Sequence, residues 1–224
     1  MKENYKPGGG NKLQPYMPAG NGSRSGRYIK KGFVQFLISE HCLKSDLEKN
    51  LTKEELFAIR RYSDYLYGPI LNKAIREGKL NKTDTLLKDL IVRAIWKHRL
   101  ENAVIVYRGI SVQRKIYDDV FYANYTSGKS IVGSTICSTS RTINRAISAA
   151  RAIDSSLVCL IFIAKLPKGY HALPIEAIAI DEEEREVLLT SPRYIIENIK
   201  EVNQNEQTLK FLKIKIKEGE NNEN

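Results

Sequence analysis

Apolar residues recur at helical spacing in the first part of the chain after residue 50. In segment 83–100, TDTLLKDLIVRAIWKHRL, they fall three and four residues apart and form one stripe along a helix. The stripe consists of Leu86, Leu87, Leu90, Ile91, Ala94 and Ile95. A stripe of this width is typical of a helix that packs against a core, so we expect a buried face here.

Two further helices are predicted before this one. Segment 51–63, LTKEELFAIRRYS, has Thr52 followed three residues later by Glu55, which is the capping-box arrangement of a helix start. Segment 64–78, DYLYGPILNKAIREG, ends on Gly78, a residue type that is favoured just past a helix end. The first half of the folded region is therefore predicted to be helical.

After residue 100 the pattern changes to short runs that are rich in β-branched residues and bounded by turn formers, which is typical of strands. The predicted strands cover residues 103–110, 156–166, 172–180, 186–190, 193–202 and 208–218. One short, alanine-rich helix is predicted between the first two strands, in 139–153. Helices first and strands afterwards favour an α+β fold over an alternating parallel fold.

Composition divides the chain into three parts. Residues 1–32 hold half of the 14 glycines, three of the 7 prolines, seven Lys or Arg and one Glu, and cannot bury much apolar surface. We therefore predict a flexible basic arm at 1–32, one domain at 33–218 and a polar tail at 219–224. Most of the net charge of +10 lies in the arm. The arm could contact nucleic acid or an acidic partner, or serve only to keep the chain soluble.

Cysteine and histidine positions give no signature of a metal site or a disulfide framework. Cys42, Cys137 and Cys159 are odd in number and form no Cys-x-x-Cys, and the 3 histidines lack metal-ligand spacing. No apolar run reaches membrane-spanning length, and the start MKENYKPGGGNK lacks the hydrophobic core of a signal peptide. We expect no metal and no membrane contact, and a protein that stays in the cytoplasm or reaches a target cell by a non-classical route.

Candidate chemistry begins with Arg108 in the stretch VYRGI. Arg108 stands near the end of a predicted apolar strand, where its side chain can leave the sheet edge, and Gly109 allows a ligand to approach the backbone closely. The planar guanidinium suits phosphate recognition. Taken alone, an arginine at a strand end is more often a surface salt-bridge partner.

Hydroxyl groups follow in the stretch GSTICSTSR. Ser138, Thr139 and Ser140 can orient a carboxylate, or they can cap the helix predicted after them.

Carboxylates come third, in the acidic run Asp181 to Glu186 that stops abruptly at the apolar VLL. Alternate residues of a strand share a face, so Glu184 and Glu186 can both point into one cleft if the strand has begun there. Two carboxylates with separate duties are a recurrent catalytic device, whereas a solvated loop is the plain alternative.

In chain order these motifs resemble the mono-ADP-ribosyltransferases of the Arg-Ser-Glu class, in particular the bacterial exoenzyme and binary-toxin branch. The likeness runs from about Leu51 to Val202. It rests on YRG, then STS, then E-x-E before VLL, and on segment 51–78, which is similar to the family's N-terminal helical element. It implies N-terminal helices packed on a split β-sandwich whose central cleft binds NAD, and a toxin or phage-type effector.

The resemblance also implies roles for single residues. Arg108 would hold the NAD phosphates, and Gly109 would contact the nicotinamide amide through its backbone. Ser138 would orient Glu186, which would contact the 2′-hydroxyl of the nicotinamide ribose and stabilise the positive charge that develops as nicotinamide leaves. Three residues of the helical element would line the NAD site: Tyr62, Asn72 and Arg76.

Glu184 bears on the acceptor, because in this family Glu-x-Glu accompanies transfer to arginine. A guanidinium has a pKa above about 12 and is a poor nucleophile unless a carboxylate positions it and helps to take its proton. We therefore predict an NAD-dependent transferase that modifies an exposed arginine of a target protein. An NAD glycohydrolase and a catalytically idle binding module with a basic arm stay open as alternatives.

The chain departs from the family pattern in two places. The loop before the acids, EAIAIDEE, lacks the aromatic residue with which several relatives recognise their target. The segment after STS has Arg141 and Arg145 but no phenylalanine that would stack on nicotinamide. The identity of the target therefore stays open.

Overall fold

The computed structural model describes residues 50–151, 156–181, 183, 185–204 and 207–217. All of them lie in the second of two units into which contacts divide the chain, His41–Asn224. The predicted basic arm and polar tail lie outside the described residues, so the boundaries 1–32, 33–218 and 219–224 stay predictions.

Three helices open the described part of the chain: α3 (Lys53–Tyr62), α4 (Tyr67–Glu77) and α5 (Lys82–Lys97). The predicted capping box is confirmed, because Thr52 Oγ1 accepts from the Glu55 amide at 3.2 Å and the Thr52 amide donates to Glu55 Oε2 at 2.9 Å. Gly78 ends α4 in the left-handed conformation, with φ 65°. The apolar stripe of α5 is buried except at Leu86, which is exposed.

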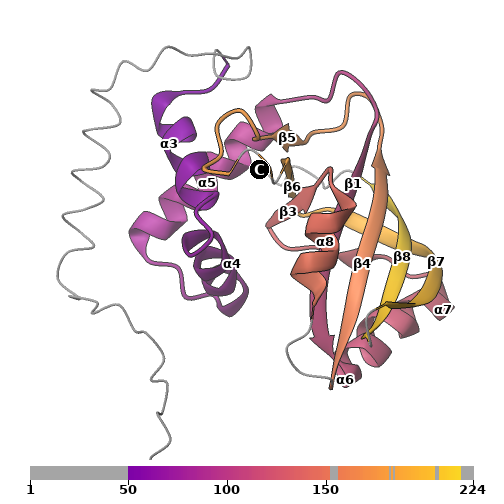
Figure 1. The fold of residues 1–224 in the computed structure, drawn as a ribbon. Helices are drawn as coiled ribbons and strands as arrows, with labels where there is room; N and C mark the ends of the chain where they lie inside the picture. The colour runs from indigo at the N-terminus through magenta and orange to yellow at the C-terminus, as the bar shows by residue number, and fades with distance from the viewer. Residues whose placement is uncertain (1–49, 152–155, 182, 184, 205–206, 218–224) are drawn as a thin grey trace, which may run out of the picture. The chain divides into compact units, whose positions relative to one another are not determined.

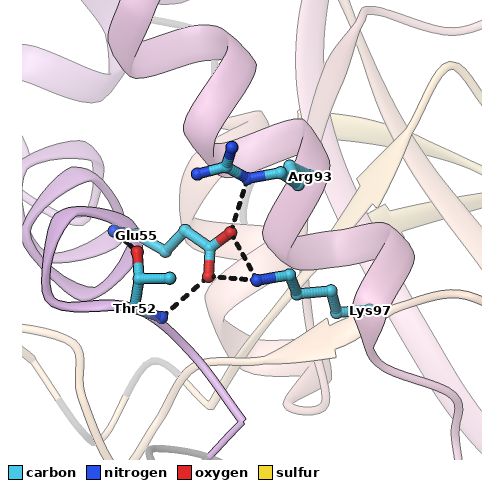
Figure 2. A network of polar contacts seen from close by, with 4 residues as sticks. All are labelled: Thr52, Glu55, Arg93 and Lys97. Carbon is cyan, nitrogen blue, oxygen red and sulfur yellow. Dashed lines mark hydrogen bonds and ion pairs between the residues drawn. The ribbon is translucent and has the colours of Figure 1, made fainter. Parts of the chain in front are cut away.

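A charged network ties α3 to α5 (Figure 2). The Glu55 carboxylate is fully buried and accepts from Arg93 Nε at 2.7 Å and from Lys97 Nζ at 2.9 Å. Burial alone would raise the pKa of Glu55, but the hydrogen bonds from Lys97, the Thr52 backbone and Arg93 outweigh it and lower the pKa. The network therefore joins α3 to α5.

The described strands form one 8-stranded sheet in the order β2-β7-β8-β4-β1-β3-β6-β5. Figure 1 labels these strands except β2. The strands are β1 (Val104–Gln113), β2 (Ile131–Val132), β3 (Ile136–Ser140), β4 (Leu157–Leu166), β5 (Leu173–Pro174), β6 (Glu186–Thr190), β7 (Arg193–Gln204) and β8 (Gln207–Lys217). Only β4 and β8 pair in parallel among these strands. Helices α3 to α5 come before this sheet in the chain, and α5 packs on β3 and β6.

The sheet is split between β1 and β3. β1 pairs with β4 along its whole length, from Val104↔Leu166 to Gln113↔Leu157, whereas its pairing with β3 is the single pair Tyr107↔Ser140. Side chains from both parts meet in one apolar core cluster, which includes Val106, Leu160 and Leu189. The predicted α+β class and the split sandwich are thus confirmed.

Four short helical elements accompany the strands. The predicted helix in 139–153 is α8 (Ile143–Ala150), which packs on β1 and β4. The sequence pattern did not predict α6 (Arg114–Ile116), the π-helix η1 (Tyr117–Tyr122) or α7 (Ala123–Ser127). None of the helices in the described part of the chain has both the length and the apolar composition of a membrane span.

One predicted strand, 172–180, is largely wrong. Only Leu173 and Pro174 pair, as β5, and the chain then turns, with the Ile178 and Ala179 amides both donating to the Ile175 carbonyl at 2.9 and 2.7 Å. Ile175 and Ile178 are buried three residues apart, which is the spacing of a turn and not of a strand. The chain after Pro174 is therefore a loop that leads toward β6.

Candidate active site

A cavity of about 570 Å³ lies where α3, α4, β1, β3, β6 and α8 meet. It brings together every predicted site residue that the structure describes: Tyr62, Asn72, Arg76, Arg108, Gly109, Ser138 and Glu186. We call it the main cleft. Glu184, the remaining predicted site residue, lies outside the described residues.

Arg108 occupies the split in the sheet. β1 and β3 separate after the pair Tyr107↔Ser140, and the guanidinium spans the opening, with Nη1 donating to the Ser138 carbonyl at 2.7 Å and to Cys137 Sγ at 3.2 Å. The expectation that Arg108 leaves the sheet at an edge is wrong, because β1 is an interior strand that continues to Gln113. Within the described chain no carboxylate forms an ion pair with Arg108.

Gly109 of β1 lies directly against the backbone of α8. A Cβ at this position would lie 1.7 Å from the Ala146 carbonyl oxygen and 2.9 Å from the Ala150 amide nitrogen. Both are backbone atoms of α8, so any side chain would push the helix away from β1. Glycine at this position lets α8 form one wall of the main cleft.

Glu186 is the first residue of β6 and is 6% exposed. The β3–β6 register places Ser140 directly opposite Glu186, while Ser138 stands opposite Leu188 on the same face of the sheet and diagonal to Glu186. Thr139 also lines the main cleft, but its buried hydroxyl donates to the Val187 backbone carbonyl at 2.7 Å. Both serines line the main cleft, and Ser140 has the nearer backbone position.

Arg185, which directly precedes Glu186, has a strained backbone conformation. Its φ is 46°, a left-handed conformation that residues with a side chain rarely adopt. The Arg185 carbonyl accepts from the Arg141 amide at 3.0 Å, so the turn is fastened to the segment that follows β3. The same segment is tied to the loop through the ion pair of Arg141 with Glu176.

Buried Tyr62 and half-buried Asn72 form a polar pair on the helical wall. Asn72 Nδ2 donates to the Tyr62 hydroxyl at 2.8 Å. Burial raises the pKa of Tyr62, and the nearby Glu186 carboxylate raises it further, so the phenol stays neutral. Asn72 Oδ1 is buried and has no hydrogen-bond partner among the described residues. A buried acceptor without a partner at the wall of a cleft is suited to a ligand donor.

Positive charge gathers around the main cleft. Arg76 is exposed at the end of α4 and has no carboxylate partner within the described chain, while Arg145 on α8 pairs loosely with Asp181 at 3.5 Å and Glu183 at 3.4 Å. Together with Arg108 they place three guanidinium groups at the cleft. This arrangement suits a ligand with more than one anionic group. In the described residues no group of three or more His, Cys, Asp or Glu is arranged to hold a metal ion.

Several lining residues were not among the predicted site residues. Ser63 and Tyr65 come from the end of α3 and the turn after it, and the Ser63 hydroxyl accepts from the Ile180 amide at 3.0 Å. Arg145 and Ala149 come from α8. Arg145 and Ala149 are four residues apart and so share one face of a helix, a spacing that could have been recognised in the sequence. The contact of Ser63 with Ile180 joins segments 117 residues apart, so no local sequence pattern indicates it.

Comparison with known proteins identifies the family and the fold of the chain. A family model described as ADP-ribosyltransferase exoenzyme matches residues 42–218. The chain is similar to the structure of Plx2a, an ADP-ribosyltransferase toxin from Paenibacillus larvae, with TM-score 0.61, 19% identity, and coverage of 85% of this chain and 94% of that chain. A search of curated proteins finds no significant match.

Two further solved structures share the fold. The C3 exoenzyme of Clostridium limosum matches with TM-score 0.58 and 19% identity over 85% of this chain and 92% of that chain. C3stau2 from S. aureus, solved with NAD, matches with TM-score 0.56 and 16% identity over 76% of this chain and 92% of that chain. Since the family model covers most of the sequence, the chain belongs to the ADP-ribosyltransferase exoenzyme family.

Proposed function

We propose that this chain transfers ADP-ribose from NAD to an arginine side chain of a target protein, as a toxin or effector. The observation that carries the proposal is the convergence of seven predicted residues, far apart in the sequence, on the walls of one cleft. Its volume of about 570 Å³ lies in the range of ligand sites in proteins.

Binding of NAD is supported by the charge and the hydrogen-bonding groups of the cleft. The Arg76 and Arg108 guanidinium groups have N–H donors left for the two phosphates, since neither forms an ion pair with a carboxylate in the described chain. Asn72 Oδ1 would accept from a hydroxyl or amide of NAD and so satisfy its buried oxygen. Ser138 and Ser140 would hold Glu186 from the neighbouring strand.

Glu186 would serve the bond-breaking step. The C–N bond between the ribose C1′ and nicotinamide breaks, and its electron pair leaves with nicotinamide. Positive charge then develops on the ribose ring, and a carboxylate that contacts the 2′-hydroxyl stabilises it. Because Glu186 is largely shielded from water at the start of β6, its charge acts over a short distance with little screening.

Glu184 would serve the bond-making step. A guanidinium nitrogen of the target arginine attacks C1′ and gives up one proton, which the Glu184 carboxylate helps to remove. The products are ADP-ribosyl-arginine, nicotinamide and one proton. The proposal for arginine rests on the Glu-x-Glu pattern in the sequence.

The test measures nicotinamide release from NAD and labelling of polyarginine, for the native chain and three variants. We expect Glu186→Gln to lose both activities by more than about a hundredfold. Glu184→Gln should lose labelling of arginine and keep hydrolysis of NAD. The matched control is Glu183→Gln, an exposed acid of the same run whose side chain reaches Arg145, and it should keep both activities.

The results separate the alternatives. If Glu184→Gln still labels polyarginine, the arginine assignment is wrong. Release of nicotinamide by the native chain without labelling of any acceptor would favour a glycohydrolase. Binding of NAD without turnover, with or without acceptor, would favour an idle binding module.

A further inference from the structure

A second cavity, of about 250 Å³, lies inside the split sandwich on the other side of Arg108. We call it the apolar pocket. Its walls come from both parts of the sheet and from the π-helix η1, and most of its lining side chains are aliphatic or aromatic. It shares Tyr107, Arg108 and Thr139 with the main cleft, and of the residues proposed for NAD chemistry only Arg108 lines it.

Three aromatic rings form one wall of the apolar pocket. Phe121 of η1 lies 5.7 Å from Phe162 of β4 between ring centroids, and Phe162 lies 5.7 Å from Tyr194 of β7 in an edge-on arrangement. Rings at these separations offer both faces and edges to a further planar group. The wall therefore favours a flat, apolar ligand over a branched or polar one.

Arg108 places a positive charge at the inner end of the apolar pocket. The guanidinium lines both the pocket and the main cleft, and its described hydrogen bonds are the two from Nη1 to Ser138 and Cys137. A half-buried cation without a carboxylate partner in the described chain is costly unless an anion approaches it. The same charge thus attracts an anionic group from either side.

The outer end of the apolar pocket is open and apolar. Val120 of η1 and Val132 of β2 both line the pocket, and they are 37% and 59% exposed. The wall that carries Val120 is a π-helix, a rare conformation that is frequent at functional sites. A cavity lined mainly by apolar side chains and open at one end has the general form of a small-molecule site.

We propose that the apolar pocket binds a small planar, apolar molecule with one anionic head, the ring against Phe162 and the head on Arg108. Because the proposed function places the NAD phosphates on the same guanidinium, the bound molecule weakens NAD binding. The binding itself does not depend on the proposed function, whereas the effect on NAD does.

The probe for the experiment is 2-naphthalenesulfonate, titrated into the full chain by calorimetry. Neutral 2-naphthalenemethanol lacks the charge, and methanesulfonate lacks the ring. The sulfonate should bind at least about tenfold more tightly than the neutral compound, because it adds a charge-assisted hydrogen bond, and methanesulfonate should not bind detectably. Equal affinity of the charged and neutral naphthalenes would overturn the assignment of Arg108 as the anion site.

Variants locate the probe. Val132→Trp places a large ring at the mouth of the apolar pocket and should abolish binding, as should Val120→Trp, while Val132→Ala should keep it. Ala149→Trp narrows the main cleft from α8 and should leave binding of the sulfonate unchanged. Thermal unfolding checks that each variant is folded. Loss of binding in Ala149→Trp with retention in Val132→Trp and Val120→Trp would place the probe in the main cleft and overturn the proposal.

The effect on NAD is measured with the same variants. A saturating concentration of 2-naphthalenesulfonate should raise the apparent Kd of NAD by about fivefold or more in the native chain, and not in Val132→Trp. An unchanged Kd in the native chain would disprove the coupling. If NAD fails to bind under any condition while the sulfonate binds in the predicted way, the proposed function fails and the apolar pocket stands.

Discussion

Arg108 Nη1 lies 2.7 Å from the Ser138 carbonyl oxygen, at the point where β1 and β3 stop pairing. The side chain thereby supplies one hydrogen bond across the split, where the backbone ladder between β1 and β3 has ended. Within the described residues its hydrogen bonds are the two from Nη1, to Ser138 and Cys137. In the proposed function the same guanidinium also binds the NAD phosphates, so one residue would serve both the fold and the main cleft.

Arg108→Lys should impair both roles. Lysine keeps the charge but lacks the planar fork, so it cannot bridge the split and contact a phosphate at once. We expect the KM for NAD to rise by about tenfold or more and the midpoint of urea unfolding to fall. The matched control is Arg99→Lys, since Arg99 also donates to a carbonyl, that of Gly169 at 3.1 Å, but is exposed and outside the cleft. Equal effects of the two substitutions would contradict the bridging role.

The β3–β6 register predicts different effects for the three hydroxyl residues of STS. Ser140→Ala should lower kcat for nicotinamide release at least as much as Ser138→Ala, because Ser140 stands directly opposite Glu186. Thr139→Ala should instead lower the free energy of unfolding, by about 1 kcal/mol, with little change in kcat, because its buried hydroxyl is already bonded to the Val187 backbone carbonyl. A large fall in kcat for Ser138→Ala with none for Ser140→Ala would show that the diagonal contact dominates.

Gly109→Ala should displace α8. The new Cβ would meet the Ala146 carbonyl oxygen at 1.7 Å, and a backbone atom of a helix cannot move alone. We expect a loss of about 2–3 kcal/mol in the free energy of unfolding and weaker NAD binding, since α8 forms a wall of the cleft. Ser111→Ala, at an exposed position two residues along β1, is the control and should change neither quantity. Urea unfolding measures the free energy of unfolding, and titration measures NAD binding. If both quantities for Gly109→Ala equal those of the native chain, the close packing of α8 on Gly109 is contradicted.

The Glu55 network predicts a pH-dependent contribution to stability. Because the pKa of Glu55 is lowered in the folded state, its charge stabilises the fold at pH values above about 4.3, the usual pKa of glutamate, and this contribution is lost as the pH falls through the folded pKa. Glu55→Gln should therefore cost about 1–3 kcal/mol of the free energy of unfolding at pH 7 and less in acid.

The matched control for this prediction is Glu77→Gln. Glu77 lies at the surface end of α4 and pairs with the exposed Lys79 at 3.0 Å, so its loss should change stability by less than about 1 kcal/mol. Urea unfolding of both variants from neutral pH down to about pH 2 makes the comparison, because this range extends below the usual glutamate pKa and into the region where the lowered pKa of the folded carboxylate titrates. A penalty for Glu55→Gln that stays constant over this range would show that the ionised carboxylate is not the stabilising form.

The sequence by itself determined the elements whose signals are local. The Thr52–Glu55 capping box, the Gly78 helix end and the apolar spacing along α5 lie within a few residues of one another, and the structure has them as predicted. The order of the YRG, STS and E-x-E motifs also led to the family that the comparisons confirm. Backbone preferences within a few residues, and the order of motifs along the chain, can be recognised without knowing which distant segments are in contact.

Only the tertiary structure decided how these pieces meet. The separation of β1 from β3 at Arg108, the position of Ser140 opposite Glu186 and the hydrogen bond from Asn72 to Tyr62 depend on strand register and helix packing between distant segments. The same holds for the loop that replaces the predicted strand after Pro174, because Ile175 and Ile178 turn inward to be buried. Burial and strand register depend on the whole fold, so they cannot be predicted from local sequence patterns alone.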